Sequence, residues 1–296
     1  GEYLNNLLKK YDIKIDKEYF SNLSNDYSRA NFTTDIIKKF LNQNKVNEIY
    51  LIDFNGFLER SIEQLTKNIN FKLNLYPHGW LGNPEAYNFN KGKYFYTGPI
   101  EKQILFNQNQ NSEFQEITKE QKKKLLPKKI DKILILSTRA RNRFATNLDK
   151  NKFLKDWNLF LNTLKKNDSC EIHFKFHPNH NYKDWLIDFL LKNNFKNYKI
   201  VEGEVTEVSG NYDLVVDFGK PGSATRETLL SGTPLIIYTG LYRFDRGTNI
   251  YIFNSEYSFD NIDDLCSKIN DCIKNPGIYL EEISINNKKL SKLINS

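Results

Sequence analysis

Three of the chain's four histidines lie close together in the stretch CEIHFKFHPNH, from Cys170 to His180. His173 alternates with phenylalanines, and we expect it to be a polar residue on a partly buried strand. His177 comes where this strand should end, and Pro178 fixes the turn after it. An imidazole at such a strand end can donate a hydrogen bond to an anionic oxygen. We therefore predict that His177 and Pro178 border a phosphate-binding site.

A second candidate site lies in DFGKPGSATRETLL, where a glycine-rich turn precedes a predicted helix. Gly222, Ser223 and Thr225 would lie where this helix begins, and its free backbone N–H groups and dipole favour a phosphate group there. An ordinary helix cap is the alternative. The stretch has neither the Gly-Lys-Ser/Thr of a Walker motif nor the dinucleotide fingerprint. Glu227, one turn further on, could reach into the site or pair with a basic side chain.

Two more predicted strand ends carry polar groups. Ser137, Thr138 and Arg139 follow one strand, and two further arginines come soon after them. Clustered arginines suit a diphosphate or a carboxylate, although a solvated basic loop is the alternative. Glu202 and Gly203 follow another strand, where we expect backbone contacts to a nucleobase.

Alternating strands and helices must position these residues. The first part of the chain predicts helices at 31–44 and 57–68 and strands at 49–52, 70–79 and 93–99. The polar stretch 108–129 is interpreted as a helix plus linker. The second part predicts strands at 131–140, 170–178, 198–204, 212–219 and 233–240 and helices at 151–167, 182–194, 223–232 and from 259 onward.

This alternation predicts an α/β fold with parallel sheets. We predict two Rossmann-like domains that face a cleft, an acceptor-side domain over residues 1–128 and a nucleotide-sugar domain over residues 129–296. In such sheets ligands bind outside the carboxyl ends of the strands, which is where the polar residues above are placed.

Composition limits the function classes. The net charge is +7 and the pI about 9.0, which suits nucleic acid, an anionic membrane or phosphorylated substrates. The sequence contains no zinc-finger, RNP or basic-region pattern, so nucleic acid is not an expected partner. Three cysteines without metal or disulfide spacing predict free thiols in a reducing compartment. Because the chain contains no Met and no signal-peptide pattern, we expect a piece of a longer cytoplasmic protein.

The two motifs together resemble a known family. His177-Pro178 and Gly222-Ser223-Ala224-Thr225 are similar to the HP and serine motifs of bacterial sialyltransferases and capsule Kdo transferases, with a threonine in place of the second serine. The resemblance covers about residues 130 to 255 and implies a GT-B glycosyltransferase fold. It also implies that these motifs hold the phosphate of a CMP-activated sugar. The stretch GSATRETLLSGTPLIIY is similar to polyol-phosphate transferases that use CDP-glycerol.

The expected function is sugar transfer from a nucleotide-activated donor, with a CMP-sugar favoured, to a surface polysaccharide or glycolipid acceptor. The acceptor hydroxyl needs a base, and His78, at the end of a predicted strand, is preferred over Asp53. We expect no metal, because no Asp-X-Asp motif is present, and no cofactor. The charge also fits peripheral contact with the inner face of the cytoplasmic membrane. The alternatives are a CDP-polyol phosphotransferase-like enzyme and a non-catalytic nucleotide-binding domain of a polysaccharide assembly protein.

Overall fold

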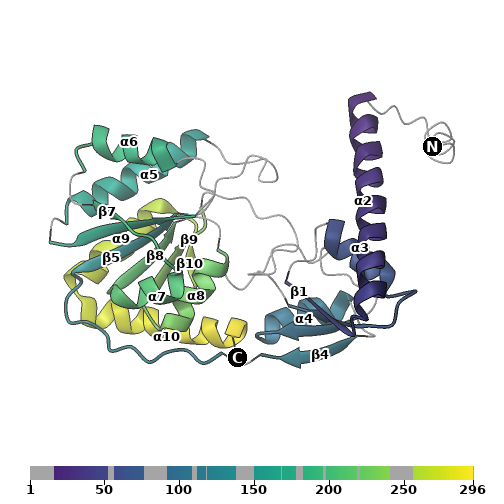
Figure 1. Cartoon of the computed structure of the whole chain (residues 1–296). Coiled ribbons are helices and arrows are strands. Elements are labelled where there is room, and N and C mark those ends of the chain that lie inside the picture. The colour runs from purple at the N-terminus through teal and green to yellow at the C-terminus, as the bar shows by residue number, and fades with distance from the viewer. Residues whose placement is uncertain are drawn as a thin grey trace.

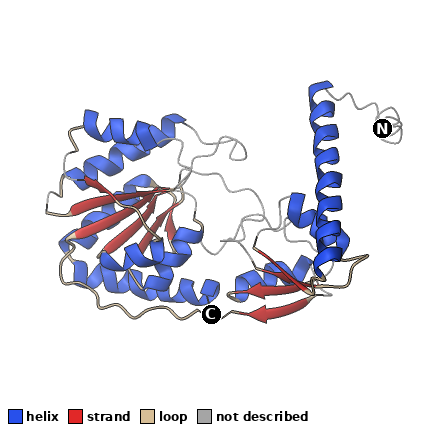
Figure 2. Cartoon of the chain, in the orientation of Figure 1, coloured by secondary structure: helices blue, strands red, loops and turns tan. Residues whose placement is uncertain are grey.

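The chain folds around two separate parallel β-sheets (Figures 1 and 2). This computed structural model describes residues 17–52, 57–76, 92–108, 112–117, 119–137, 150–167, 169–177, 183–195, 198–218, 221–240 and 256–295. The predicted α/β class with two Rossmann-like units is confirmed. The predicted boundary at residue 128 lies in the extended segment that joins the two sheets and stays a prediction.

The first sheet has four parallel strands in the order β1-β2-β3-β4. Its strands are β1 (Glu48–Leu51), β2 (Lys72–Leu75), β3 (Lys93–Tyr96) and β4 (Glu113–Glu116), and its helices are α2 (Lys17–Asn44), α3 (Phe57–Leu65) and α4 (Pro99–Gln108). Leu41 of α2, Leu65 of α3 and Leu105 of α4 join Leu75 and Tyr94 of the strands in one buried cluster. The three helices and the strands therefore share one hydrophobic core.

The second sheet has six parallel strands in the order β10-β9-β8-β5-β6-β7. Its strands are β5 (Lys132–Ser137), β6 (Glu171–Phe176), β7 (Tyr198–Ile200), β8 (Leu214–Phe218), β9 (Leu235–Tyr238) and β10 (Ser258–Phe259). Its helices are α5 (Lys150–Lys165), α6 (Lys183–Lys192), α7 (Val205–Val208), the 3-10 helix η2 (Ser209–Asn211), α8 (Ser223–Ser231), α9 (Ile262–Lys274) and α10 (Pro276–Asn295). The order reverses between β8 and β5, as in doubly wound sheets.

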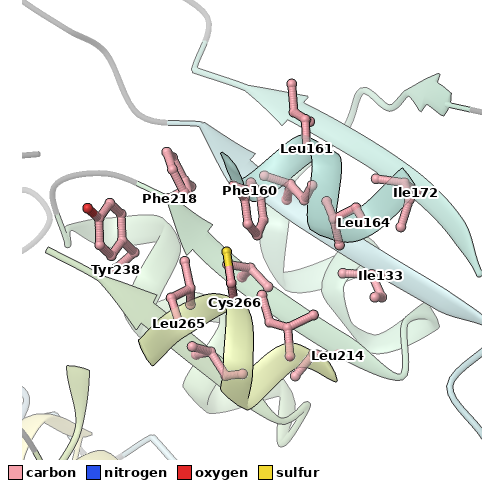
Figure 3. Close-up of a cluster of buried hydrophobic side chains, with 14 of the residues drawn as sticks. Ile133, Phe160, Leu161, Leu164, Ile172, Leu214, Phe218, Tyr238, Leu265 and Cys266 are labelled. Atoms are coloured by element: carbon pink, nitrogen blue, oxygen red, sulfur yellow. The ribbon is translucent and has the colours of Figure 1, made fainter. Parts of the chain in front are cut away.

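Helices cover both faces of this second sheet. On one face, Phe160 of α5 and Leu265 of α9 pack against Phe218 of β8 (Figure 3). On the other face, Leu229 of α8 and Leu290 of α10 join a second buried cluster. Adjacent residues of a strand point to opposite faces of the sheet, and both faces are covered here. All of β8 is therefore buried, which explains its nearly continuous apolar sequence.

The segment before β5 differs from the prediction of a helix plus linker over 108–129. It forms the edge strand β4, paired with β3, and then an extended chain. Its lysine-rich part offers few apolar residues at helical spacing, and Pro127 disfavours a helix. The sequence reading also missed α4 and the two-residue β10.

The extended chain is bound to the second sheet's helices. Gln121 Nε2 and the Lys122 backbone N donate to the Leu229 and Leu230 carbonyls, each at 2.8 Å. Lys124 Nζ donates to the carbonyls of Gly210 and Tyr212 and to the Thr233 hydroxyl. This segment therefore has a fixed path along α8 and η2.

Gly232 makes the close approach of this segment to α8 feasible. It ends the helix with a φ of +74°, where a side chain is strained. A Cβ at this position would also collide with the Lys122 carbonyl oxygen. Glycine is therefore required here for two separate reasons.

Candidate functional site

The candidate site lies at the carboxyl edge of the second sheet. The strand ends are in register, with Ser137 of β5 paired to Phe176 of β6 on one side and to Phe218 of β8 on the other. The His177 backbone N donates to the Ser137 carbonyl at 3.2 Å. His177 is exposed just beyond this edge. Ser137, whose side chain is buried, thus ends β5 next to the reversal of strand order, and His177 follows β6 on the other side of β5.

The turn that begins α8 is held by a chain of hydrogen bonds. The Gly222 backbone N donates to Thr225 Oγ1 at 2.8 Å, and this hydroxyl donates to Asp217 Oδ2 at 2.5 Å. Thr225 is fully buried, so its hydroxyl fixes the turn and does not face solvent. Ser223 is exposed at the first position of the helix. Ser223 and the N–H groups of the first turn are the donors left to bind an anion.

Asp217 supports this turn from inside the sheet. Its side chain is fully buried, and its Oδ1 has no hydrogen-bond partner among the described residues. Burial raises the pKa of this carboxyl to about 7, and the hydrogen bond from Thr225 opposes that shift. The sequence analysis did not single out Asp217. Its signal was an aspartate inside the apolar run LVVDF.

Two glutamates approach each other beside α8. Burial is the main cause that raises the pKa of Glu227, and the negative charge of Glu204 adds to it. Positive charges of Lys119, Arg226 and Lys175 oppose the shift. Glu227 is half-buried and Glu204 is exposed, and each carboxylate can accept hydrogen bonds. Lys175 on β6 is a further nearby cation that the sequence analysis did not place in the site.

Glu202 and Gly203 follow the edge strand β7. Both are exposed, and Gly203 has a φ of +101°, which turns the chain toward α7. Because α7 packs against α8, this turn carries Glu204 toward Glu227. Glu204 directly follows Glu202 and Gly203, the two residues predicted from the sequence. Through Glu204, the structure brings the end of β7 near the α8 turn.

The remaining predicted residues lie outside the described part of the chain. These are the candidate bases Asp53 and His78, the donor-site residues Thr138 and Arg139, and Pro178 after His177. Their roles stay predictions.

A buried ion pair connects α8 to the first sheet. Arg226 Nη1 lies 3.5 Å from Glu101 Oε1, and the Thr97 backbone N and Oγ1 each donate to Glu101 Oε2 at 2.8 Å. Burial raises the pKa of Glu101 and lowers that of Arg226, while the opposite charges counteract both shifts. Thr97 Oγ1 also lies 3.3 Å from the Ile294 carbonyl of α10. The helix that begins at the candidate site therefore also contacts α4, a helix that packs on the first sheet.

His173 is buried on β6, and both of its ring nitrogens lie within hydrogen-bond distance of a neighbouring side chain. Its Nδ1 lies 2.7 Å from the Tyr212 hydroxyl and its Nε2 lies 3.2 Å from Glu171 Oε2. Burial lowers the pKa of its imidazole.

Within the described residues, no group of three or more His, Cys, Asp or Glu side chains is arranged to hold a metal ion. In the same part of the chain, no helix has the length and apolar character needed to cross a bilayer.

No protein-family model and no curated protein matches the sequence. Solved structures do match the fold. A putative UDP-N-acetylglucosamine 2-epimerase from Listeria monocytogenes matches with a TM-score of 0.57 and 11% identity, over 95% of this chain and 80% of that one. Sucrose-phosphate synthase from Thermosynechococcus elongatus matches with a TM-score of 0.55 and 13% identity, over 88% and 73%.

A third match is the pneumococcal O-GlcNAc transferase GtfA in complex with UDP and GlcNAc. Its TM-score is 0.55 and its identity 10%, over 87% of this chain but only 56% of that one. At such identities the likeness concerns the fold alone. The two parallel sheets, the strand order and these matches together show that the chain has the α/β fold of GT-B glycosyltransferases and of UDP-GlcNAc 2-epimerases.

Proposed function

We propose that this chain is a glycosyltransferase that moves a sugar from a nucleotide-activated donor to an acceptor hydroxyl. The observation that carries the proposal is the α8 turn. Asp217 and Thr225 fix it from inside, and its helix N-terminus opens at the carboxyl edge of the sheet near the reversal of strand order. A fixed helix N-terminus beside such a reversal suits the phosphate group of a nucleotide.

Each described group then has a role in handling the donor. The first-turn N–H groups and Ser223 bind the phosphate, and His177 donates to it from the end of β6, one strand beyond β5. Charge develops on this phosphate as the sugar leaves, so fixed donors stabilise the transition state. Glu227 and Glu204 accept hydrogen bonds from the nucleoside sugar. Within this proposal a CMP-sugar is the first candidate donor, on the resemblance of the HP and serine motifs, and a UDP-sugar is the second.

The acceptor side completes the proposal. His78, or otherwise Asp53, takes the proton from the acceptor hydroxyl, and the reaction needs neither a metal ion nor a cofactor. The acceptor is a surface polysaccharide or a lipid-linked glycan, reached through peripheral contact with the membrane. These elements come from the sequence, and substitution of Asp53 and of His78 is the test of the base.

Nucleotide binding is the first test. Thermal unfolding should be followed with CMP, CDP, UDP, GDP or ADP present, without and with Mg²⁺. A ligand at a hundredfold excess over its Kd stabilises the protein by about 2.7 kcal/mol. Stabilisation by CMP directs the assay to CMP-sugars, by CDP to polyol-phosphate transfer, and by UDP to UDP-sugars, where conversion of free UDP-GlcNAc would reveal an epimerase. If none of the nucleotides shifts the midpoint, the nucleotide site is disproved.

Turnover with the identified donor then tests the residues. His177→Ala should lower kcat about tenfold to a thousandfold by removing one transition-state donor, while His177→Gln should retain part of the rate. His78→Ala and Asp53→Asn should identify the base through a changed pH–rate profile. Asn158→Ala on the exposed side of α5 serves as the control and should leave the rate unchanged. Intact nucleotide binding without turnover on any donor would instead support the non-catalytic alternative.

A further inference from the structure

A basic groove lies between the extended segment and α10, and one of its lysines, Lys119, also acts on the charge of Glu227 in the candidate site. It has a cavity volume of about 660 Å³, and its wall is formed by residues 119–125 on one side and by Gly232, Ser284, Lys288, Ser291 and Lys292 on the other. Figure 1 shows the chain between β4 and β5 passing along the outer side of α10. We refer to this feature as the basic groove.

The basic groove has a higher ratio of basic to acidic residues than the chain as a whole. The whole chain has 43 basic and 36 acidic residues, whereas the groove is lined by six lysines and one glutamate. One of them, Lys124, is half-buried in hydrogen bonds to Gly210, Tyr212 and Thr233. The other five are exposed, namely Lys119, Lys122, Lys123, Lys288 and Lys292. A general excess of lysine does not explain this local ratio.

The groove also presents the apolar side chain of Leu125 to solvent, and Ile285 is exposed on α10 outside the groove lining. Leu125 lies in its wall and is 93% exposed, the highest value among the large hydrophobic residues of the described chain. Ile285, three residues before Lys288 on α10, is 53% exposed. The Lys122 backbone N and the Lys124 side chain bind the segment just before Leu125 to the protein, and Leu125 itself is exposed to solvent.

Exposed leucine among clustered lysines fits one kind of partner best. Phosphate groups of lipids attract lysines near a bilayer, and an apolar side chain gains by entering the boundary between headgroups and acyl chains. A soluble polyanion would use the lysines but would leave Leu125 in water. We propose that the basic groove docks on the surface of an anionic lipid bilayer, with Leu125 entering the headgroup region and the lysines contacting lipid phosphates. This rests on the peripheral membrane contact proposed above and not on the donor chemistry.

Vesicle co-sedimentation tests this docking with the whole chain. Wild-type protein should bind phosphatidylcholine vesicles that contain about 30% phosphatidylglycerol and should not bind pure phosphatidylcholine. Binding should weaken as salt is raised from about 0.15 M to 0.5 M. Lys122→Gln combined with Lys123→Gln, and Lys288→Gln combined with Lys292→Gln, should each weaken partition about tenfold or more. Leu125→Ser should weaken it while keeping its salt dependence.

The matched control is Lys38→Gln combined with Lys39→Gln, which makes the same charge change on exposed positions of α2. It should bind vesicles like the wild type, and all variants should keep the wild-type thermal midpoint. Equal losses in the control and groove variants would overturn the proposed location. Binding of soluble polyphosphate without vesicle binding, or no binding to either, would overturn the membrane as partner. Nucleotide binding needs no vesicles, so the two proposals can fail separately.

Discussion

The two sheets of this molecule differ in how completely they are buried. In the second sheet all five residues of β8 and all four of β9 are buried, and helices cover both faces. In the first sheet three residues each of β2 and β3 are buried, but in the edge strand β1 only Leu51 is buried and Tyr50 is 57% exposed. A polar residue inside β8 or β9 is therefore costly and calls for an explanation, while one on the exposed strand β1 does not. Asp217 is such a residue, and it lies beneath the candidate phosphate site.

The two sheet regions should differ most in the unfolding free energy that is lost when an aromatic side chain is removed from each. Phe160 is fully buried and stacks on Phe218, so Phe160→Ala should lower the free energy of unfolding by about 3–5 kcal/mol. Tyr50→Ala on the first sheet should cost less than about 1 kcal/mol, since its ring is mostly exposed. Urea unfolding of both variants measures the difference. Similar losses would mean that the first sheet is as tightly packed as the second.

Asp217 should make stability depend on pH. Its pKa is near 3.8 when unfolded and about 7 when folded, so the folded protein binds the extra proton between these values. The energetic cost of this burial is absent below pH 3.8, grows as pH rises and is complete above pH 7, where it reaches about 4 kcal/mol. Asp217→Asn removes the titration, and its stability relative to the wild type should therefore rise between about pH 4 and about pH 7 and stay level above that.

The slope is the informative quantity, because the Asp217→Asn substitution adds amide hydrogens whose cost does not depend on pH. Urea unfolding at several pH values gives both curves. Parallel curves for wild type and Asp217→Asn would show that the carboxyl does not titrate in this range. Measured nucleotide affinity adds a second readout, since a neutral residue under the α8 turn should favour an anionic ligand above about pH 7.

Breaking the Arg226–Glu101 ion pair between the two sheet regions should lower the free energy of unfolding by a smaller amount. Arg226→Met leaves Glu101 buried without its cation and should cost about 3 kcal/mol. The double variant with Glu101→Leu should recover part of that loss, because it removes the unpaired charge. Chemical unfolding of the wild type, both single variants and the double variant completes the cycle. Strictly additive losses would mean that Arg226 and Glu101 do not interact.

The sequence predicted the second sheet better than the first, for physical reasons. Long apolar runs followed by turns, as in LVVDF before Gly222, mark buried parallel strands and placed His177, Ser223 and Thr225 at strand or helix ends. The short edge strand β4 has the sequence EFQE, whose backbone pairing with β3 gives no hydrophobic signal. The Arg226–Glu101 pair joins residues 125 positions apart, and a single sequence carries no sign of such a contact.

The smallest expected loss of stability comes from removing the Thr225 hydroxyl. Its removal tests whether the hydrogen bonds that hold the α8 turn matter for nucleotide binding as well as for stability. Thr225→Val keeps the shape of the side chain but removes the hydroxyl that accepts from Gly222 N and donates to Asp217. We expect a loss of about 1 kcal/mol in unfolding free energy, the usual value of a helix cap, and weaker nucleotide binding because the turn loses its fixed geometry. Thr225→Ser should restore both, measured by urea unfolding and by nucleotide titration. If Thr225→Val destabilised the fold but bound nucleotide like the wild type, the turn would be a structural cap with no part in binding.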